Sequence, residues 1–83
     1  MNVRKLALGD RNRIGSRVTE ARRNLGISQV ELMAKLQTRG IDISASSVSL
    51  LEGQKRPVMD FELVVLADIL KVDVHWLLGI EEK

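Results

Sequence analysis

The sequence predicts an all-α fold, a compact bundle of five helices. Apolar residues recur at spacings of three and four along most of the chain, which is the spacing of one buried helix face. Serine, asparagine or aspartate precedes several of these segments, and glycine follows them, as helix caps do. The length of 83 residues suits one domain, which we divide into an N-terminal arm (1–11), a helical domain (12–79) and a tail (80–83).

The first helix is expected over about Asn12 to Leu25, with Asp10 or Asn12 near its cap and Gly26 at its end. Its buried stripe follows the i, i+4, i+7, i+11 spacing and consists of Ile14, Val18, Ala21 and Leu25.

Ser28 is expected to cap a second helix, because Glu31 follows three residues later and completes a capping box. The buried face of this helix is predicted to consist of Leu32, Met33 and Leu36. A connection from Gln37 to Ile43, which contains Gly40 and two isoleucines, leads to the next helix.

Ser44 is the expected N-cap of a third helix, from Ala45 to Glu52, which Gly53 closes. Val48 and Leu51 face inward, so the outer side must carry Ala45, Ser46, Ser49 and Leu50. An exposed basic loop follows, formed by Gln54, Lys55, Arg56 and Pro57.

A fourth, strongly apolar helix is predicted from Asp60, and a short fifth helix from Val74 to Leu78 with Asp73 as its cap. The main stripe of the fourth helix consists of Leu63, Leu66, Ala67 and Leu70. Phe61, Val65 and Ile69 extend its apolar surface beyond one face, so the rest of the core or a second subunit is expected to cover them. Trp76 and Leu77 are expected to close the bundle, and Gly79 to end the last helix.

Composition excludes several classes of function. The chain has no cysteine and one histidine, so we expect no metal site, no cofactor and a reducing compartment. No apolar run is long enough to cross a membrane and no signal-peptide core is present, so a cytoplasmic protein is expected. The serines around Ser46 and the distant His75 lack an acidic partner at a catalytic spacing, so we expect no enzyme.

Charge is distributed unevenly along the chain. Residues 1–57 contain 11 Lys and Arg against five acids, whereas residues 58–83 contain two against six. Such an uneven charge orients a protein so that its basic face approaches a polyanion. A basic face that contacts only solvent would give the same charge pattern in the sequence.

Three segments, LGISQVEL, VSLLEGQKRP and LADILKVDVHWLLG, resemble the Cro/repressor-type (XRE-like) helix-turn-helix family of phage and bacterial regulators. The resemblance covers about residues 12–79. It implies a bundle of the phage-repressor DNA-binding domain type, with the helix-turn-helix at the second and third helices. The helix at residues 44–52 would then lie in the major groove of DNA.

The resemblance also implies roles for individual residues. Gln29, at the start of the second helix, matches a position that contacts a phosphate, and Arg22 and Glu52 match a structural salt bridge. Further phosphate contacts would come from the loop residues Gln54, Lys55 and Arg56. The candidates for contacts with base edges are Arg39, Ala45, Ser46, Ser47, Ser49 and Leu50.

The chain departs from the family pattern in three ways. The interval from Leu32 to Glu52 is longer than usual, which enlarges the turn, and Met33 replaces a small alanine. The recognition face is poor in base-reading groups, since Ala45 and Leu50 can touch only thymine methyl groups and serine discriminates weakly. Arg39 could supply one bidentate contact.

The leading hypothesis is therefore a double-stranded DNA-binding regulator, a transcriptional repressor that acts as a homodimer. The alternative is a helical protein-interaction module with weak or no DNA binding, and a DNA-binding antitoxin with a protein partner lies between the two.

Overall fold

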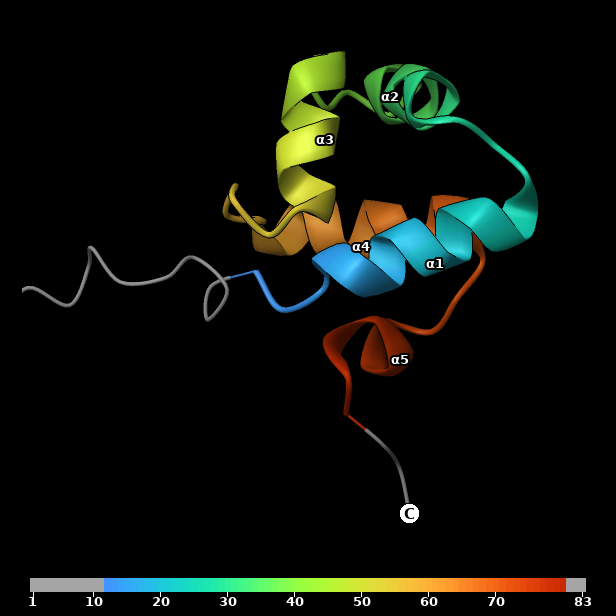
Figure 1. Ribbon diagram of the computed structural model, residues 1–83, viewed down its shortest axis with the longest axis vertical. Coiled ribbons are helices and arrows are strands. Elements are labelled where there is room, and N and C mark those ends of the chain that lie inside the picture. The colour runs from blue at the N-terminus through green and yellow to red at the C-terminus, as the bar shows by residue number, and fades with distance from the viewer. Residues whose placement is uncertain (1–11, 81–83) are drawn as a thin grey trace, which may run out of the picture.

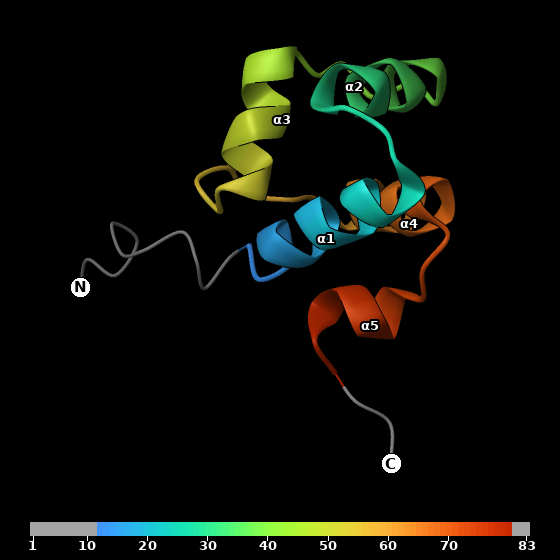
Figure 2. The same ribbon diagram turned by 45° about the vertical axis from the view of Figure 1, so that its right-hand side comes forward.

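Five α-helices make up the computed structural model, which describes residues 12–80 and contains no strand in that range (Figure 1). Helices α1 and α4 run side by side, α3 stands across one end of the pair, and α5 lies on the opposite side from α2 and α3 (Figures 1 and 2). The bounds are α1 Gly15–Leu25, α2 Gln29–Thr38, α3 Ala45–Glu52, α4 Asp60–Leu70 and α5 Val74–Leu78.

Helix α1 begins three residues later than its sequence pattern suggested. The N-cap is Ile14, two residues after Asn12, and its side chain makes no capping bond. Asn12 is instead buried, and its Oδ1 accepts a hydrogen bond from the Ile14 N–H at 3.2 Å. Asp10, the other residue expected near the cap, lies outside the described residues.

The buried stripe of α1 is shorter than expected. Ile14, Val18 and Ala21 are buried, but Leu25 is exposed at the last turn of the helix. Gly26 then ends α1 in the left-handed conformation at φ 75°, which glycine adopts without the strain of a side chain.

Serine caps open the next two helices as predicted. At α2, Ser28 Oγ accepts from the Glu31 N–H at 3.0 Å, and the Glu31 carboxylate accepts from the Ser28 N–H at 2.7 Å. At α3, Ser44 Oγ accepts from the Ser47 N–H at 3.1 Å. These bonds satisfy backbone donors that have no partner within the helix.

The connection between α2 and α3 is part of the core. Helix α2 continues through Thr38, two residues into the stretch expected to be the turn. Ile41 and Ile43 are both buried, and the Gln37 side chain donates to the Ile43 carbonyl at 3.0 Å. The enlarged turn is therefore anchored at two apolar points rather than left loose in solvent.

One apolar core joins all five helices and this connection. Met33 and Leu63, both expected to be buried, lie at its edge and are only partly buried. Trp76 is also partly buried, whereas Leu77 is fully enclosed. The buried apolar residues are Ile14, Val18, Ala21, Leu32, Leu36, Ile41, Ile43, Val48, Leu51, Leu66, Ala67, Leu70 and Leu77.

Helix α4 leaves part of its apolar surface uncovered. Phe61 and Val64 are 57% and 60% exposed, and Met59 just before the helix is 53% exposed. Val65 and Ile69, in contrast, are packed against the core. No helix between residues 12 and 80 is long and apolar enough to cross a membrane.

Candidate nucleic-acid interface

The outer face of α3 is open to solvent along its whole length. Ala45, Ser46, Ser49 and Leu50 are exposed, and Leu50 exposes 46% of its surface. Ser47 is half-buried, and its Oγ accepts a hydrogen bond from Ser44 Oγ at 3.1 Å. The face thus presents small side chains, hydroxyl groups and one large apolar side chain.

The inner face of α3 is fixed in the bundle. Val48 and Leu51 are buried in the core against α1 and α2. At the start of α1, a Cβ added to Gly15 would lie 2.6 Å from the Leu51 carbonyl oxygen, so the two backbones are in close contact. Glycine permits this approach because it has no side chain.

Glu52 ties the end of α3 to α1 through an ion pair with Arg22. Arg22 donates through Nε to Glu52 Oε2 at 2.8 Å and through Nη2 to Oε1 at 3.1 Å. The two side chains are only 11% and 5% exposed. Arg22 Nη1 also donates to the Ile27 carbonyl at 2.9 Å, so each of the three guanidinium nitrogens makes a hydrogen bond within the bundle.

Two further side chains complete the hydrogen bonding of Glu52. Thr19 Oγ1 donates to Glu52 Oε1 at 2.9 Å, and Gln29 Nε2 donates to the same oxygen at 3.0 Å. Burial by itself raises the pKa of Glu52, but these hydrogen bonds and the charge of Arg22 outweigh it, so the pKa lies below the ordinary value of 4.5. Gln29 keeps its backbone N–H and a second amide hydrogen for an outside partner.

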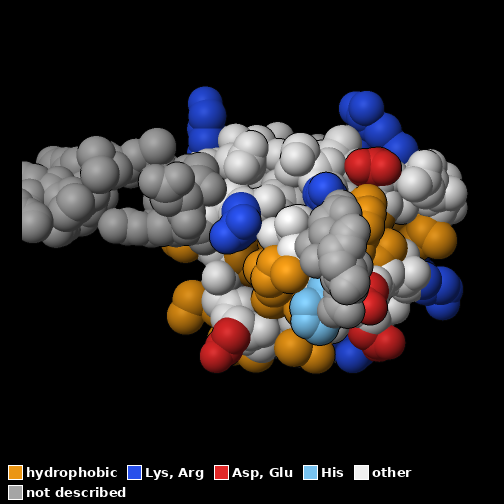
Figure 3. Space-filling view, turned by 90° about the horizontal axis from the view of Figure 1, so that it is seen from below, with side chains coloured by type: hydrophobic (Ala, Val, Ile, Leu, Met, Phe, Trp, Pro, Cys, Tyr) orange, Lys and Arg blue, Asp and Glu red, His pale blue; other side chains and the backbone are white. Residues whose placement is uncertain are grey.

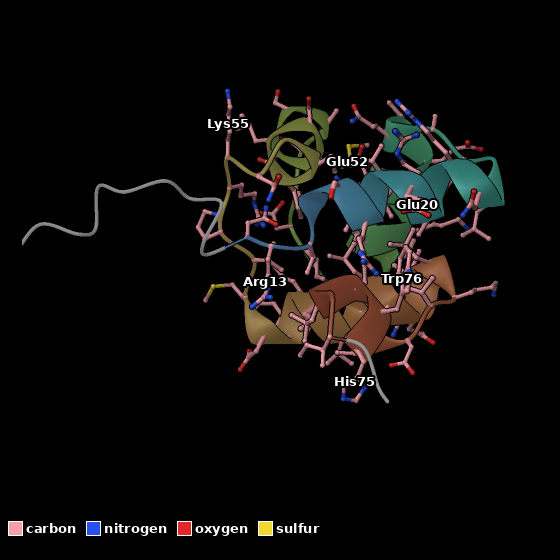
Figure 4. The ribbon with its side chains drawn as sticks, turned by 60° about the horizontal axis from the view of Figure 1, so that its bottom comes forward. Arg13, Glu20, Glu52, Lys55, His75 and Trp76 are labelled. Carbon is pink, nitrogen blue, oxygen red and sulfur yellow. The ribbon has the colours of Figure 1, made fainter. Side chains whose placement is uncertain are left out.

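The loop after α3 is shaped by its backbone. Gln54 takes the left-handed conformation at φ 61°, and the Lys55 N–H donates to the Leu50 carbonyl at 2.8 Å. This bond holds Lys55 against the last turn of α3. Its side chain is exposed and points outward on the α3 side of the molecule, whereas His75 lies on the opposite side at α5 (Figure 4).

Gln54 and Arg56, expected at phosphates, have internal partners in the structure. Gln54 Nε2 donates to the Asn12 carbonyl at 2.9 Å. Arg56 forms a two-point ion pair with Glu62 at 3.0 Å for each bond, and the pair is largely buried. The hydrogen bond from Arg56 lowers the pKa of Glu62, and Glu62 in turn raises that of Arg56.

Arg39 lies away from the outer face of α3. Its Nη1 donates to Asp68 Oδ2 at 2.7 Å, which ties the end of α2 to α4. Arg17 is likewise engaged, since its guanidinium lies 4.9 Å from the centre of the Trp76 ring and donates to the Trp76 carbonyl at 2.8 Å. Among residues 12–57, partners within the fold therefore engage Arg17, Arg22, Arg39 and Arg56, although the Arg39 pair is exposed to solvent.

Asn12 and Glu62 have structural roles that the sequence did not reveal. Asn12 Nδ2 donates to the carbonyls of Leu51 at 2.9 Å and Arg56 at 2.8 Å, so it joins the start of α1 to the loop after α3. Nothing local marks this role, because the partners lie about forty residues away. Glu62 had a signal, since a glutamate in the first turn of a helix can accept from the preceding backbone, as it does from the Met59 N–H at 3.0 Å.

The described residues contain no group of three or more His, Cys, Asp or Glu arranged to hold a metal ion. Comparison of the chain with models of protein families, with curated proteins and with solved structures finds no match.

Proposed function

We propose that this protein binds double-stranded DNA in a sequence-directed way, as a helix-turn-helix regulator of the Cro/repressor type. In this proposal α2 and α3 form the helix-turn-helix, and α3 enters the major groove. The role is binding without catalysis or a cofactor, and repression of transcription is the expected result of occupying an operator.

The observation that carries the proposal is the contrast between the two faces of α3. Its inner face is held by the core and by the Glu52 bonds to α1 and α2, whereas its outer face is bare from Ala45 to Leu50. The major groove of DNA is just wide enough for an α-helix. A helix that is fixed in the bundle, and whose outer face has small side chains without partners, can therefore enter it. Lys55 stands beside that face, where it can hold a phosphate.

We further propose that two copies act together. One small module covers only about 600–1,000 Å² on DNA, so two half-sites about 34 Å apart are the usual way to reach useful affinity. The exposed apolar side chains Met59, Phe61 and Val64 supply a surface for the second copy. They belong to α4 and the turn before it, so pairing there leaves α3 free.

The test is affinity for duplex DNA measured by fluorescence anisotropy across a salt series. DNA binding through phosphates predicts a steep negative slope of log affinity against log salt. The variant Lys55→Gln should reduce that slope by about one unit for each bound subunit, the value for one lost phosphate contact. Lys71→Gln removes the same charge at the end of α4 and should leave the slope unchanged.

Absence of binding to any duplex, even at low salt, would overturn the proposal. Equal slopes for Lys55→Gln and Lys71→Gln would show nonspecific attraction to the whole molecule instead. Arg56→Ala is a poorer probe, because it leaves Glu62 buried without its partner and so perturbs the fold.

The exposed apolar surface of α4 also favours a second candidate function, a protein-interaction module. Hydrophobic side chains gather around the single histidine on the side of the molecule away from α3 (Figure 3). An interaction module without DNA binding would keep its partner affinity in Lys55→Gln and lose it in Phe61→Ser. An antitoxin-like protein would show both the salt-dependent DNA binding and the partner binding.

A further inference from the structure

A hollow of about 420 Å³ lies between the ends of α1, α2 and α4, and none of its lining residues belongs to α3. Its volume falls within the range of about 300–1,000 Å³ that is typical of pockets for small molecules. Three apolar side chains, Leu25, Ile27 and Ile69, line it. Leu25 is exposed, and the other two are only partly buried against the core. A ligand that covers these side chains would therefore remove apolar surface from water.

Three cations also line this hollow, against a single acid. The cations are Lys35, Arg39 and Lys71, and the acid is Asp68. A cation near the C-terminus of a helix is favoured by the helix dipole, so each of these residues taken alone indicates nothing. Here, however, all three line the same apolar hollow. Their charges exceed that of the one carboxylate, so the hollow attracts an anion.

Arg39 has hydrogen-bond donors to spare for such an anion. Its Nη1 donates to Asp68 Oδ2 at 2.7 Å, in a pair that is exposed to solvent. Its Nε and Nη2 make no hydrogen bond within the part of the chain that the structure describes. These N–H groups share one edge of the planar guanidinium and match the two oxygens of a carboxylate. Arg39 can therefore bind a carboxylate and keep its bond to Asp68.

The backbone conformation of Lys71 adds an independent observation. Lys71 follows α4 in the left-handed conformation at φ 60°. Gly26 and Gly79 occupy the same position after α1 and α5, at φ 75° and 76°. A side chain raises the energy of this conformation, and glycine avoids that cost. The helix end by itself would thus favour glycine, whereas a lysine here supplies a cation to the hollow.

We propose that this hollow binds a small organic anion, a carboxylate joined to a short apolar chain. The chain covers the three apolar side chains, and Arg39 and Lys71 hold the carboxylate. Three helices end at the hollow, and their C-terminal dipoles oppose negative charge, so a singly charged carboxylate suits it better than a doubly charged phosphate. This ligand site goes beyond the proposed function and does not depend on DNA binding.

The experiment uses octanoate as the probe, titrated into the full chain and followed by ¹H–¹⁵N NMR. We expect saturable shifts of the amide signals of Ile27, Arg39 and Ile69, and none at Ser46 and Ser49 of α3. Octanol, which has the same chain without the charge, should bind about tenfold more weakly because it forms no charged hydrogen bonds. Butanoate should also bind more weakly, by up to about fourfold for each methylene group that it lacks.

Protein variants assign the binding to the hollow. Arg39→Gln should weaken octanoate binding about tenfold and leave the fold intact, because its pair with Asp68 is exposed. Lys71→Gly should weaken binding several-fold without lowering the unfolding temperature, since glycine accepts the left-handed conformation freely. Arg13→Gln removes an exposed arginine just before α1 and should keep the full affinity.

Several outcomes would overturn the proposal. Absence of saturable shifts removes the site, and equal affinity for octanol and octanoate removes the role of the charge. Tighter binding of octyl phosphate than of octanoate contradicts the choice of a carboxylate. Undiminished affinity in both Arg39→Gln and Lys71→Gly places the probe elsewhere, and shifts confined to Phe61 and Val64 place it on the exposed apolar surface of α4.

Discussion

The carboxylate of Glu52 accepts hydrogen bonds from two helices besides its own, through Thr19 and Arg22 in α1 and Gln29 in α2. A single side chain thereby sets the position of α3 relative to the start of α2. Because the carboxylate is almost fully buried, it depends on these donors for its solvation.

Removal of Arg22 should therefore be costly. We expect Arg22→Ala to lower the free energy of unfolding by about 3–5 kcal/mol, because Glu52 would remain buried without its counter-charge. Urea denaturation followed by circular dichroism measures the change. Arg23→Ala removes an exposed arginine from the same turn of α1 and should have little effect. Equal midpoints for Arg22→Ala and the unaltered chain would contradict this account.

The depressed pKa values of Glu52 and Glu62 predict acid instability. A carboxyl whose pKa is lower in the folded state stabilises the fold fully above its unfolded value of 4.5, and this stability is lost as pH falls through the folded pKa. Urea midpoints should be flat from neutral pH to about 5 and then fall. Glu52→Gln should be less stable at neutral pH and show a shallower fall; a fall as steep as in the unaltered chain would contradict the role of Glu52.

At the level of the helices, the backbones of α1 and α3 approach each other so closely at Gly15 that an added side-chain atom would clash. A Cβ at Gly15 would meet two backbone carbonyls, of Leu51 at 2.6 Å and Glu52 at 2.8 Å, as well as the Gln54 side chain at 2.8 Å. The carbonyls cannot move without shifting the end of α3. Alanine ordinarily favours helices over glycine by about 1 kcal/mol, so this contact decides the sign of the substitution.

We expect Gly15→Ala to destabilise the protein by about 1–3 kcal/mol, the usual cost of overpacking a tight contact. Thermal unfolding measures the effect. Ser16→Ala, at the next and exposed position, serves as the control and should be neutral or slightly stabilising. A more stable Gly15→Ala variant would show that α1 and α3 can separate at no cost.

The long connection between α2 and α3 also helps to hold these two helices in place. Ile41 and Ile43 are buried, and the Ile41 N–H donates to the Leu36 carbonyl at 3.1 Å. The extra length therefore adds core contacts instead of freedom between the two helices. Met33 packs at the edge of the same core.

For the molecule as a whole, the charge pattern of the sequence overstates the free basic surface. Several cations of residues 12–57 are ion-paired or hydrogen-bonded within the fold, namely Arg17, Arg22, Arg39 and Arg56. The side chain of Lys55 is exposed and makes no ion pair or hydrogen bond with the other described residues. Its charge is therefore available to the proposed interface. We therefore expect a salt slope set by a few phosphate contacts in each subunit rather than by the total charge.

The exposed apolar surface formed by Met59, Phe61 and Val64 leads to a separate prediction about self-association. Phe61→Ser should abolish the proposed self-association, measured by sedimentation velocity, because it removes the largest apolar side chain of that surface. The fold should be nearly unaffected, since the side chain is 57% exposed. Lys71→Ser, at the far end of α4, is the control. Unchanged association in Phe61→Ser would place the interface elsewhere.

Local sequence patterns were enough to predict the five helices and most of their ends, because helix periodicity, serine caps and terminal glycines act over a few residues. They also indicated which face of α3 is outermost. Which polar side chains remain available near that face depends on how the helices pack against one another. Gln54 and Arg56 were predicted beside Lys55 as phosphate contacts, and Arg39 was predicted as a base-edge contact. In the structure Gln54, Arg56 and Arg39 are bonded to Asn12, Glu62 and Asp68, which lie in other segments of the chain. Hydrogen-bond geometry between distant segments depends on how the helices pack, and no local pattern encodes it.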